Sequence, residues 1–354
     1  MTVRAWAELL RVSALFTVPG DALAGAAASG RRPDRGSVLA VGASLCLYEA
    51  GMALNDWADR EEDAIDRPHR PIPSGRIAPG AALAAAGALT AAGLGLAARA
   101  GRPALAVATG LAATVWAYDL RLKHTPAGPA AMAAARGLDL LLGATATGAT
   151  KRTGPGPGRG PGAAPGAGWQ SRPGPGSDPA ARGLVRGALP AAGLLGAHTY
   201  AVTAVSRHEA HGGSTTAPLA ALAAVAALGA AAVHEQRGRR GDRETDPPTG
   251  CGGQDESPRP HPSHRSPATP TRTATGLVRT ALTGSYFRTA AVPLLHAALN
   301  PSPPLTQRAV GGGIRAMIPL QAALAARAGA VGTGLAVMGL VPIARNLARK
   351  VSPT

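Results

Sequence analysis

One stretch decides how this chain is interpreted, Asn55-Asp56-Trp57-Ala58-Asp59-Arg60-Glu61-Glu62-Asp63, which continues as Ala64-Ile65-Asp66-Arg67-Pro68-His69-Arg70-Pro71-Ile72-Pro73-Ser74-Gly75. If it is helical, Asn55, Asp59 and Asp63 fall on one face, with Asp56 beside them. Carboxylates gathered so closely need a cation, and hard oxygen ligands suit Mg²⁺, which shares its remaining positions with substrate phosphates. We therefore predict a magnesium site here, with Arg67 and Arg70 binding the same phosphates.

Long apolar runs on both sides of this stretch predict an all-α membrane protein. The 354 residues are 45% hydrophobic and 3% aromatic, and the mean hydropathy is only +0.06 because polar segments dilute the apolar runs. A window of about 19 residues resolves these runs as a bundle of about nine transmembrane helices. The predicted spans are 12–28, 37–54, 81–98, 103–117, 127–150, 184–205, 217–233 and 285–299, followed by a short interfacial helix and a ninth span within 314–344.

Two segments rich in Gly, Pro and Arg interrupt the runs, at about 151–183 and 236–275. Their composition cannot bury enough apolar surface to fold, so we predict disordered inserts within a single domain covering 1–354. The first run could be mistaken for a signal peptide, but its acidic Asp21 favours a retained, kinked helix. Inside the fifth span, Arg136 and Asp139 stand at i and i+3, where they can pair with each other or serve a site.

The formal net charge of +16 does not indicate a nucleic-acid partner. The arginines are spread over loops and helix ends with few aromatic residues beside them, whereas nucleic-acid binders show a basic stripe or a stacking platform. Lipid headgroups and a diphosphate substrate explain the charge more simply. Cys46 and Cys251, the only cysteines, give neither a disulfide framework nor a zinc spacing.

The quoted stretch resembles the first aspartate-rich motif of the UbiA superfamily of intramembrane prenyltransferases, and the branch predicted within it is the EboC-like one. The resemblance implies a nine-helix bundle that moves an isoprenyl group from an isoprenoid diphosphate to an acceptor, with Mg²⁺ as cofactor. It implies metal ligands at Asn55, Asp56, Asp59 and Asp63. Tyr118-Asp119-Leu120-Arg121-Leu122-Lys123 is similar to the family's Tyr-Ser-x-x-Leu-Lys. The resemblance thereby implies catalytic roles for Arg67, Arg70, Tyr118 and Lys123.

The second motif of that family, Asp-x-x-x-Asp after span six, is replaced here by Ser206-Arg207-His208-Glu209-Ala210-His211. Glu209 could hold a metal, and Arg207 could bind diphosphate in place of one cation. The loop could equally be a polar connector without a ligand role. The Ser-Arg-x-Glu-x-x-Gly-Gly string carries the resemblance to the EboC-like branch. Arg207, Arg136 and Asp139 are the predicted substrate-binding residues.

The three motif loops follow spans two, four and six, so they lie on one side of the membrane. We expect that side to be cytoplasmic on the family resemblance, because counting Lys and Arg does not decide the orientation. Two other functions stay open. A non-catalytic carrier of isoprenoid diphosphates could dispense with the second motif, and a transporter would place charges at the bilayer midplane, where Arg136 and Asp139 are the only hint. The acceptor is not determined by the sequence.

Overall fold

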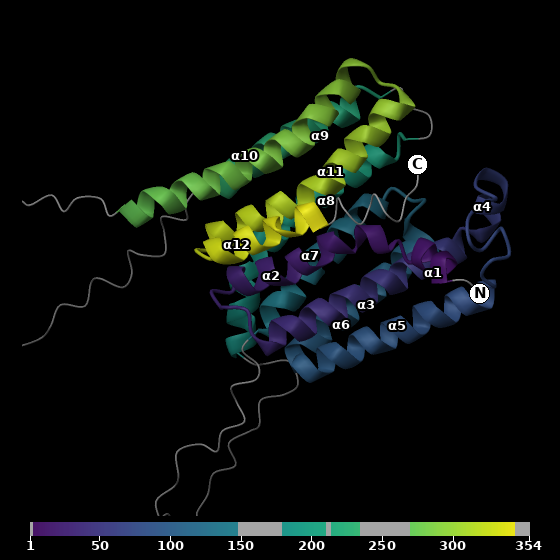
Figure 1. Ribbon diagram of the computed structural model, residues 1–354, viewed down its shortest axis with the longest axis horizontal. Helices are drawn as coiled ribbons and strands as arrows, with labels where there is room; N and C mark the ends of the chain where they lie inside the picture. Colours follow the sequence, from purple (N-terminus) through teal and green to yellow (C-terminus); the bar gives the residue numbers. More distant parts are fainter. Residues whose placement is uncertain (1–2, 148–178, 210–213, 234–269, 344–354) are drawn as a thin grey trace, which may run out of the picture.

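The computed structural model describes residues 3–147, 179–209, 214–233 and 270–343, which form helices and connecting loops (Figure 1). No β-strand occurs within these ranges. The elements are α1 (Val3–Leu9), η1 (Val12–Thr17), α2 (Val18–Ala28), α3 (Arg35–Ala58), α4 (Arg60–Asp66), α5 (Pro79–Ala100), α6 (Arg102–Ala117), η2 (Tyr118–Leu122), α7 (Gly128–Ala146), α8 (Pro179–Ser206), α9 (Thr216–Val233), α10 (Pro270–Leu299), α11 (Pro303–Arg327) and α12 (Val331–Met338).

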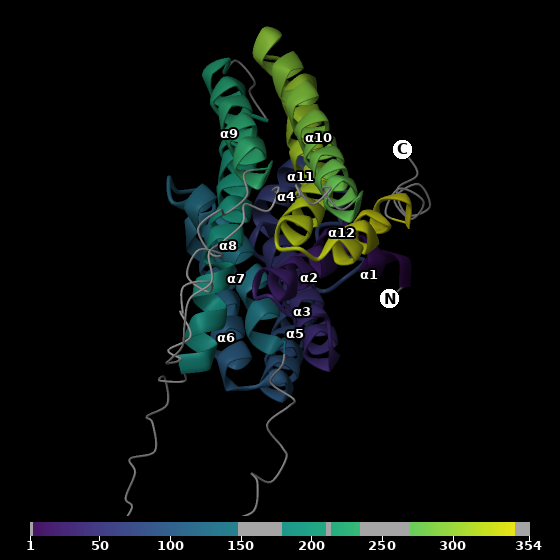
Figure 2. The same ribbon diagram turned by 90° about the vertical axis from the view of Figure 1, so that its left-hand side faces the viewer.

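The long helices pack as one bundle with α2, α7 and α8 in the middle. Figures 1 and 2 both place α9, α10 and α11 on one side of this middle layer and α3, α5 and α6 on the other. Helices α2 and α7 approach each other closely. A Cβ added at Gly143 would lie 2.2 Å from the carbonyl oxygen of Ala22, so only glycine permits this contact. Small residues at such crossings let helix backbones approach closely, as is common between membrane helices.

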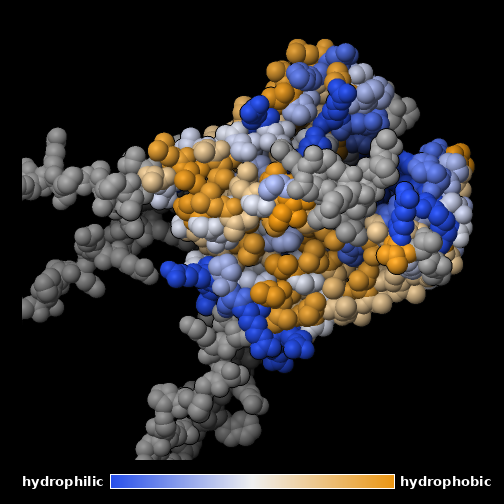
Figure 3. Space-filling view, in the orientation of Figure 1, coloured by the Kyte–Doolittle hydropathy of each residue, from blue (hydrophilic) through white to orange (hydrophobic). Residues whose placement is uncertain are grey.

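Five helices in the described ranges are long and apolar enough to cross a membrane: α3, α5, α8, α9 and α11. Shorter apolar helices occur at Leu15–Ala28 and Val331–Ile343. Figure 3 shows hydrophobic residues over the middle of the visible face and hydrophilic residues gathered over α4. The predicted all-α membrane bundle is therefore confirmed.

The final apolar region differs from its prediction. We expected a short interfacial helix followed by a span, but α11 is one continuous helix through Pro319, and the short helix α12 follows it. The buried surroundings of Pro319 hold the helix together across the proline, because tertiary packing outweighs the lost backbone hydrogen bond. The chain instead turns at Gly329, whose φ of 89° is readily adopted only by glycine.

Two helices begin inside the predicted inserts, since α8 starts at Pro179 and α10 at Pro270. Proline suits a helix start, where its missing N–H is not needed. The rest of both inserts lies outside the described residues.

The three motif loops meet at one end of the bundle. The Lys123 ammonium forms an ion pair with Asp59, and the Arg207 guanidinium donates to the Thr125 carbonyl at 3.0 Å. These contacts join the ends of α3, η2 and α8, so we refer to this end as the motif end.

We expect single cysteines at Ser74, His124 and Ser214 to react with a membrane-impermeant thiol reagent from the same side only. Each residue lies in a loop at the motif end, so one side of the bilayer reaches all three. The measurement is labelling of right-side-out and inverted vesicles, with Cys46 and Cys251 replaced by alanine. The family resemblance predicts that this side is cytoplasmic. Labelling of one position from the opposite side would contradict the bundle topology.

Candidate functional site

The aspartate-rich stretch is not one continuous helix. Helix α3 ends at Ala58, Asp59 caps it with φ −89° and ψ 5°, and α4 begins at Arg60. The single helical face expected for Asn55, Asp59 and Asp63 is therefore not formed. Asn55 and Asp56 belong to α3, whereas Asp63 belongs to α4. The break turns the carboxylates toward different basic side chains.

Arg70 joins two of these carboxylates. Its guanidinium lies 2.6 Å from the Asp63 carboxylate and 3.4 Å from that of Asp56. Arg67 lies 3.4 Å from Asp63, and Arg11 lies 3.3 Å from Asp56. Asp63 is only 1% exposed, and Arg67 and Arg70 balance its buried negative charge. The predicted phosphate-binding arginines thus contact carboxylates in this structure, and Arg11 joins them from 45 residues away, where no local spacing could reveal it.

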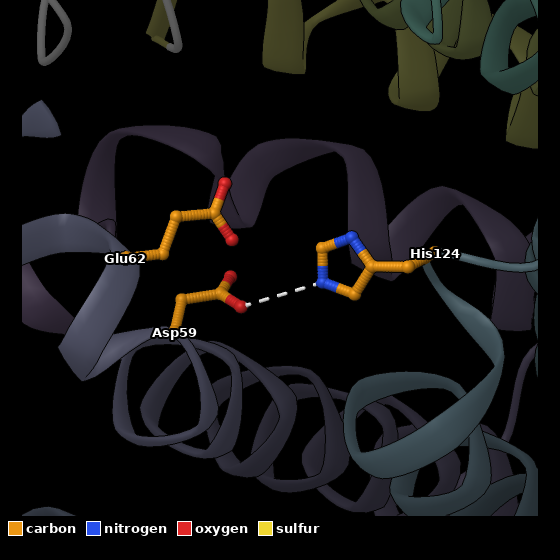
Figure 4. Close-up of side chains that lie close together, drawn as sticks. All are labelled: Asp59, Glu62 and His124. Carbon is orange, nitrogen blue, oxygen red and sulfur yellow. Dashed lines mark ion pairs between the residues drawn. The ribbon is translucent and has the colours of Figure 1, made fainter.

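Asp59 faces a second cluster on the other side of the break. It pairs with Lys123, and the His124 Nε2 lies 3.9 Å from its carboxylate. One ligand atom each from Asp59, Glu62 and His124 lies within 4.8 Å of the others, and Figure 4 shows the three side chains pointing toward one another. Sequence reasoning missed Glu62 and His124 as site residues. Glu62 could have been found from its i, i+3 spacing from Asp59. His124 could have been found because it directly follows Lys123.

The turn η2 brings a further carboxylate to Asn55. The Asn55 amide donates to Asp119 at 3.2 Å. Burial raises the pKa of Asp119 to about 7, although Asn55 and Lys123 both favour its charged form. Burial also raises the pKa of Tyr118. Asp119 was not predicted as a site residue, because its position carries serine in the resembling motif.

A cavity of about 300 Å³ opens below these groups between α3, α6, α7 and α11. We call Arg11, Asn55, Tyr118 and Asp119 the cavity mouth. Its walls carry apolar side chains, namely Leu47, Met52, Leu111, Val115, Met132 and Met317. The end of the cavity opposite the mouth is lined by polar residues. We call these residues, Ser44, Tyr48, Arg136 and Asp139, the cavity floor. Charged loops over an apolar cavity match a molecule with an anionic head and an apolar body.

Arg136 and Asp139 do not pair with each other as their spacing suggested. Arg136 instead lies 2.6 Å from the carboxylate of Asp21 on α2, which also accepts from Gln321 at 2.6 Å. Asp139 accepts a hydrogen bond from Ser44. The neighbouring helices offer each group a better-placed partner than its own helix does.

The loop after α8 reaches the motif end but brings only one carboxylate there in the described residues. Arg207 is exposed, and its guanidinium donates a hydrogen bond to the Thr125 carbonyl. Glu209 is half-buried, and burial raises its pKa while the positive charge of Arg67 lowers it. His211 lies outside the described residues. Glu209 therefore lies close enough to Arg67 for their charges to interact, and its role as a metal ligand stays a prediction.

The donor set at the motif end fits Mg²⁺. Asp59 and Glu62 offer neighbouring carboxylates with His124 beside them, and Asn55 and Asp119 add oxygens at the cavity mouth. Oxygen-rich sites of this composition are typical of that ion. Asp56 and Asp63 are less available, because arginines already occupy their oxygens.

The fold and this site define a polytopic membrane protein that places carboxylates and basic residues over an apolar cavity. Residues 14–171, less than half of the chain, match the UbiA prenyltransferase family. This match confirms that the chain resembles that family, as the motif indicated. Its assignment to the EboC-like branch stays a prediction.

Curated relatives match part of the chain. The chain is 38% identical over 129 residues to digeranylgeranylglyceryl phosphate synthase of Methanopyrus kandleri, covering 35% of this chain and 46% of the relative. It is 40% identical over 110 residues to the bacteriochlorophyll synthase 33 kDa chain of Rhodobacter capsulatus, covering 29% and 36%. The chain thus spans less than half the length of these relatives.

Solved structures share the fold over nearly the whole chain. A structure of digeranylgeranylglyceryl phosphate synthase in membranes matches with a TM-score of 0.54 and 17% identity, covering 93% of this chain and 99% of the other. The apo structure of a UbiA homologue from Aeropyrum pernix K1 matches with a TM-score of 0.53 and 17% identity, covering 85% and 96%. At this identity the likeness establishes the fold alone.

Proposed function

We propose that this protein is a membrane-embedded prenyltransferase that moves an isoprenyl group from an isoprenoid diphosphate to an acceptor. The observation that carries the proposal is the mouth of the cavity. There Arg11, Asn55 and Asp119 line the opening of a cavity with apolar walls, and the neighbouring Lys123–Asp59 ion pair is close enough for the Lys123 charge to act on Asp119. This arrangement suits a diphosphate held at the motif end and a prenyl chain kept away from water.

The reaction breaks the allylic carbon–oxygen bond, and the electron pair leaves with the diphosphate. Mg²⁺ held by Asp59, Glu62 and Asn55 would supply positive charge against the departing group. Lys123, which pairs with Asp59, would donate to the same diphosphate. Arg67, whose side chain is 57% exposed, and Arg70, whose side chain is 21% exposed, would donate to the outer phosphate oxygens. The apolar walls exclude water, so the acceptor attacks the prenyl carbon in its place.

Removal of divalent metal tests this proposal. EDTA should abolish diphosphate release by the purified chain, and Mg²⁺ should restore it, because the leaving charge is otherwise balanced only by side chains. The measurement is diphosphate release from a panel of isoprenyl diphosphates in the presence of a lipid extract as the acceptor source. Calcium, which prefers larger and more flexible coordination, is the matched control and should restore less activity. Full release in EDTA would contradict the metal assignment.

A non-catalytic carrier of isoprenoid diphosphates is the second candidate. The observation that favours it is the weak second motif, where Glu209 is the carboxylate that the described residues bring near Arg67. The same experiment separates the two functions. A carrier binds the donors tightly with Mg²⁺ but releases no diphosphate from any of them.

A further inference from the structure

A second cavity, of about 350 Å³, lies at the end of the bundle opposite the motif end. The ends of α2 and α11 and the first turns of α8 line it, mostly with alanine and glycine. Gly187 on its wall stands 19 residues before Ser206, which at 1.5 Å per residue places it about 28 Å from the end of α8. Figure 1 shows the two ends of the bundle, with α4 at the motif end and α12 at the other. The proposed reaction gives this cavity no role.

The charged side chain that lines this cavity is Arg327, the last residue of α11. Arg279 of α10 lies close enough for the two positive charges to act on each other. Both arginines are half-buried, and the Arg279 Nε is buried without a hydrogen-bond partner. Within the described ranges, neither guanidinium forms an ion pair or a hydrogen bond. Two neighbouring cations withdrawn from water are unfavourable unless an anion joins them.

Exposed arginines add positive charge at the rim of the same cavity. Gly30, which lines it, is followed directly by Arg31 and Arg32, and Arg186 directly precedes Gly187 on α8. No Asp or Glu lines the cavity in the described part of the chain. At the motif end, by contrast, the arginines contact carboxylates. An anion that approaches this second cavity therefore meets positive charge alone.

A simpler role for Arg327 would be to bond the free carbonyl groups at the end of α11, as basic residues in a last helical turn often do. The turn that follows the helix already provides these bonds. The backbone N–H groups of Ala328, Gly329 and Ala330 donate to carbonyls of the last turn at 3.0–3.1 Å. The Arg327 guanidinium is therefore left for another partner.

The position of the cavity indicates which anion fits. It lies at the ends of α8 and α11, two helices that are long and apolar enough to cross a membrane, so it opens where lipid headgroups lie. Its walls include Ala28, Ala191 and Leu324, which can contact the start of an acyl chain. Basic pockets between membrane helices are typical sites for acidic lipid headgroups.

We propose that this cavity binds the phosphate of an anionic phospholipid in the leaflet opposite the motif end. Arg327 and Arg279 bind the phosphate oxygens, and Arg31, Arg32 and Arg186 attract the headgroup. Free phosphate has the same chemistry, and the position at the ends of two membrane-spanning helices favours the lipid. The site is separate from the proposed transferase site.

Three probes test this inference on the full chain in micelles of an uncharged detergent: dioctanoyl phosphatidylglycerol, dioctanoyl phosphatidylcholine and inorganic phosphate. Binding is measured from the ligand-dependent rise of Tm. We expect phosphatidylglycerol to bind about tenfold tighter or more than phosphatidylcholine of the same chain length, because only the first carries a net negative charge. Equal binding of the two lipids would overturn the inference. Inorganic phosphate that binds as tightly as phosphatidylglycerol would overturn the lipid as the ligand.

The Arg327→Gln variant locates the binding site. Its affinity for phosphatidylglycerol should fall about tenfold, because it removes the charge that lines the cavity. Arg102→Gln is the matched control. Arg102 is an exposed arginine at the same end of the bundle, at the start of α6 and outside the cavity, so its loss should change the affinity less than about twofold. An equal fall in both variants would reduce the effect to general surface attraction and contradict the site.

A second variant, Gly187→Leu, fills the cavity and keeps every charge. A Cβ at Gly187 would lie 3.6 Å from the Ala28 carbonyl oxygen, an ordinary contact, so we expect the protein to fold with a wild-type Tm in the absence of lipid. Its affinity for phosphatidylglycerol should fall about tenfold as well. If Arg327→Gln does not fold, this variant decides alone, and wild-type affinity in Gly187→Leu would overturn the inference.

Discussion

Replacing Asp59 with asparagine should lower the rate of diphosphate release by about a hundredfold or more, the effect of losing roughly 3 kcal/mol of transition-state stabilisation. Asp59 is the residue that joins the two halves of the site. It faces Glu62 and His124 on one side and pairs with Lys123 on the other. Asparagine keeps its shape but removes the charge that would hold a metal.

The control for this variant is Glu61→Gln. Glu61 is 86% exposed and pairs with Arg60, so its loss should change the rate by less than about twofold. The measurement is the release rate at saturating Mg²⁺ and donor, with Tm recorded to show that both proteins are folded. An Asp59→Asn protein that keeps most of the wild-type rate would exclude Asp59 from the site.

Replacing Arg70 with glutamine should destabilise the protein by up to about 3 kcal/mol, because it removes the cation shared by two buried carboxylates and leaves each with one longer contact, Asp63 to Arg67 at 3.4 Å and Asp56 to Arg11 at 3.3 Å. Arg70 contacts both Asp63 and Asp56, whose side chains are 1% and 6% exposed. Arg67→Gln is the matched control. Its guanidinium is 57% exposed and makes one longer contact to the same Asp63, so its loss should cost about 0–1 kcal/mol.

The measurement is the free energy of unfolding of each variant in the same detergent. The double variant Arg70→Gln with Asp63→Asn should recover part of the loss, because it removes the unpaired charge together with its partner. Equal destabilisation by Arg70→Gln and Arg67→Gln would show that Arg70 does not hold the motif together.

Much of the architecture could be predicted from the sequence. The apolar runs correspond to α3, α5, α6, α7, α8 and α9 to within a few residues at most ends, because a membrane span needs a long apolar helix whatever its neighbours are. The sequence also placed three polar loops at one end of the bundle, since consecutive spans alternate in direction. The motif itself indicated the family whose model matches residues 14–171.

Helix continuity was less predictable. The sequence over 314–344 predicts a helix break near Pro319, yet α11 continues through this proline because the packing around it stabilises the helix. The stretch after Asn55 shows the opposite case, because its spacing suits one helix and the chain breaks at Asp59. Local patterns report what a segment prefers, and its neighbours decide between near-equal preferences.

The sequence by itself determined that this is a helical membrane protein with an acidic and basic site at one end and two charged residues inside its fifth span. Only the tertiary structure decided which charges meet. Arg11 and Asp56 are 45 residues apart, Lys123 and Asp59 are 64 apart, and Arg136 and Asp21 are 115 apart. A buried charge takes the best-placed partner in space, and helix packing sets that placement, so spacing along the chain could not reveal these pairs or the cavity floor that one of them forms.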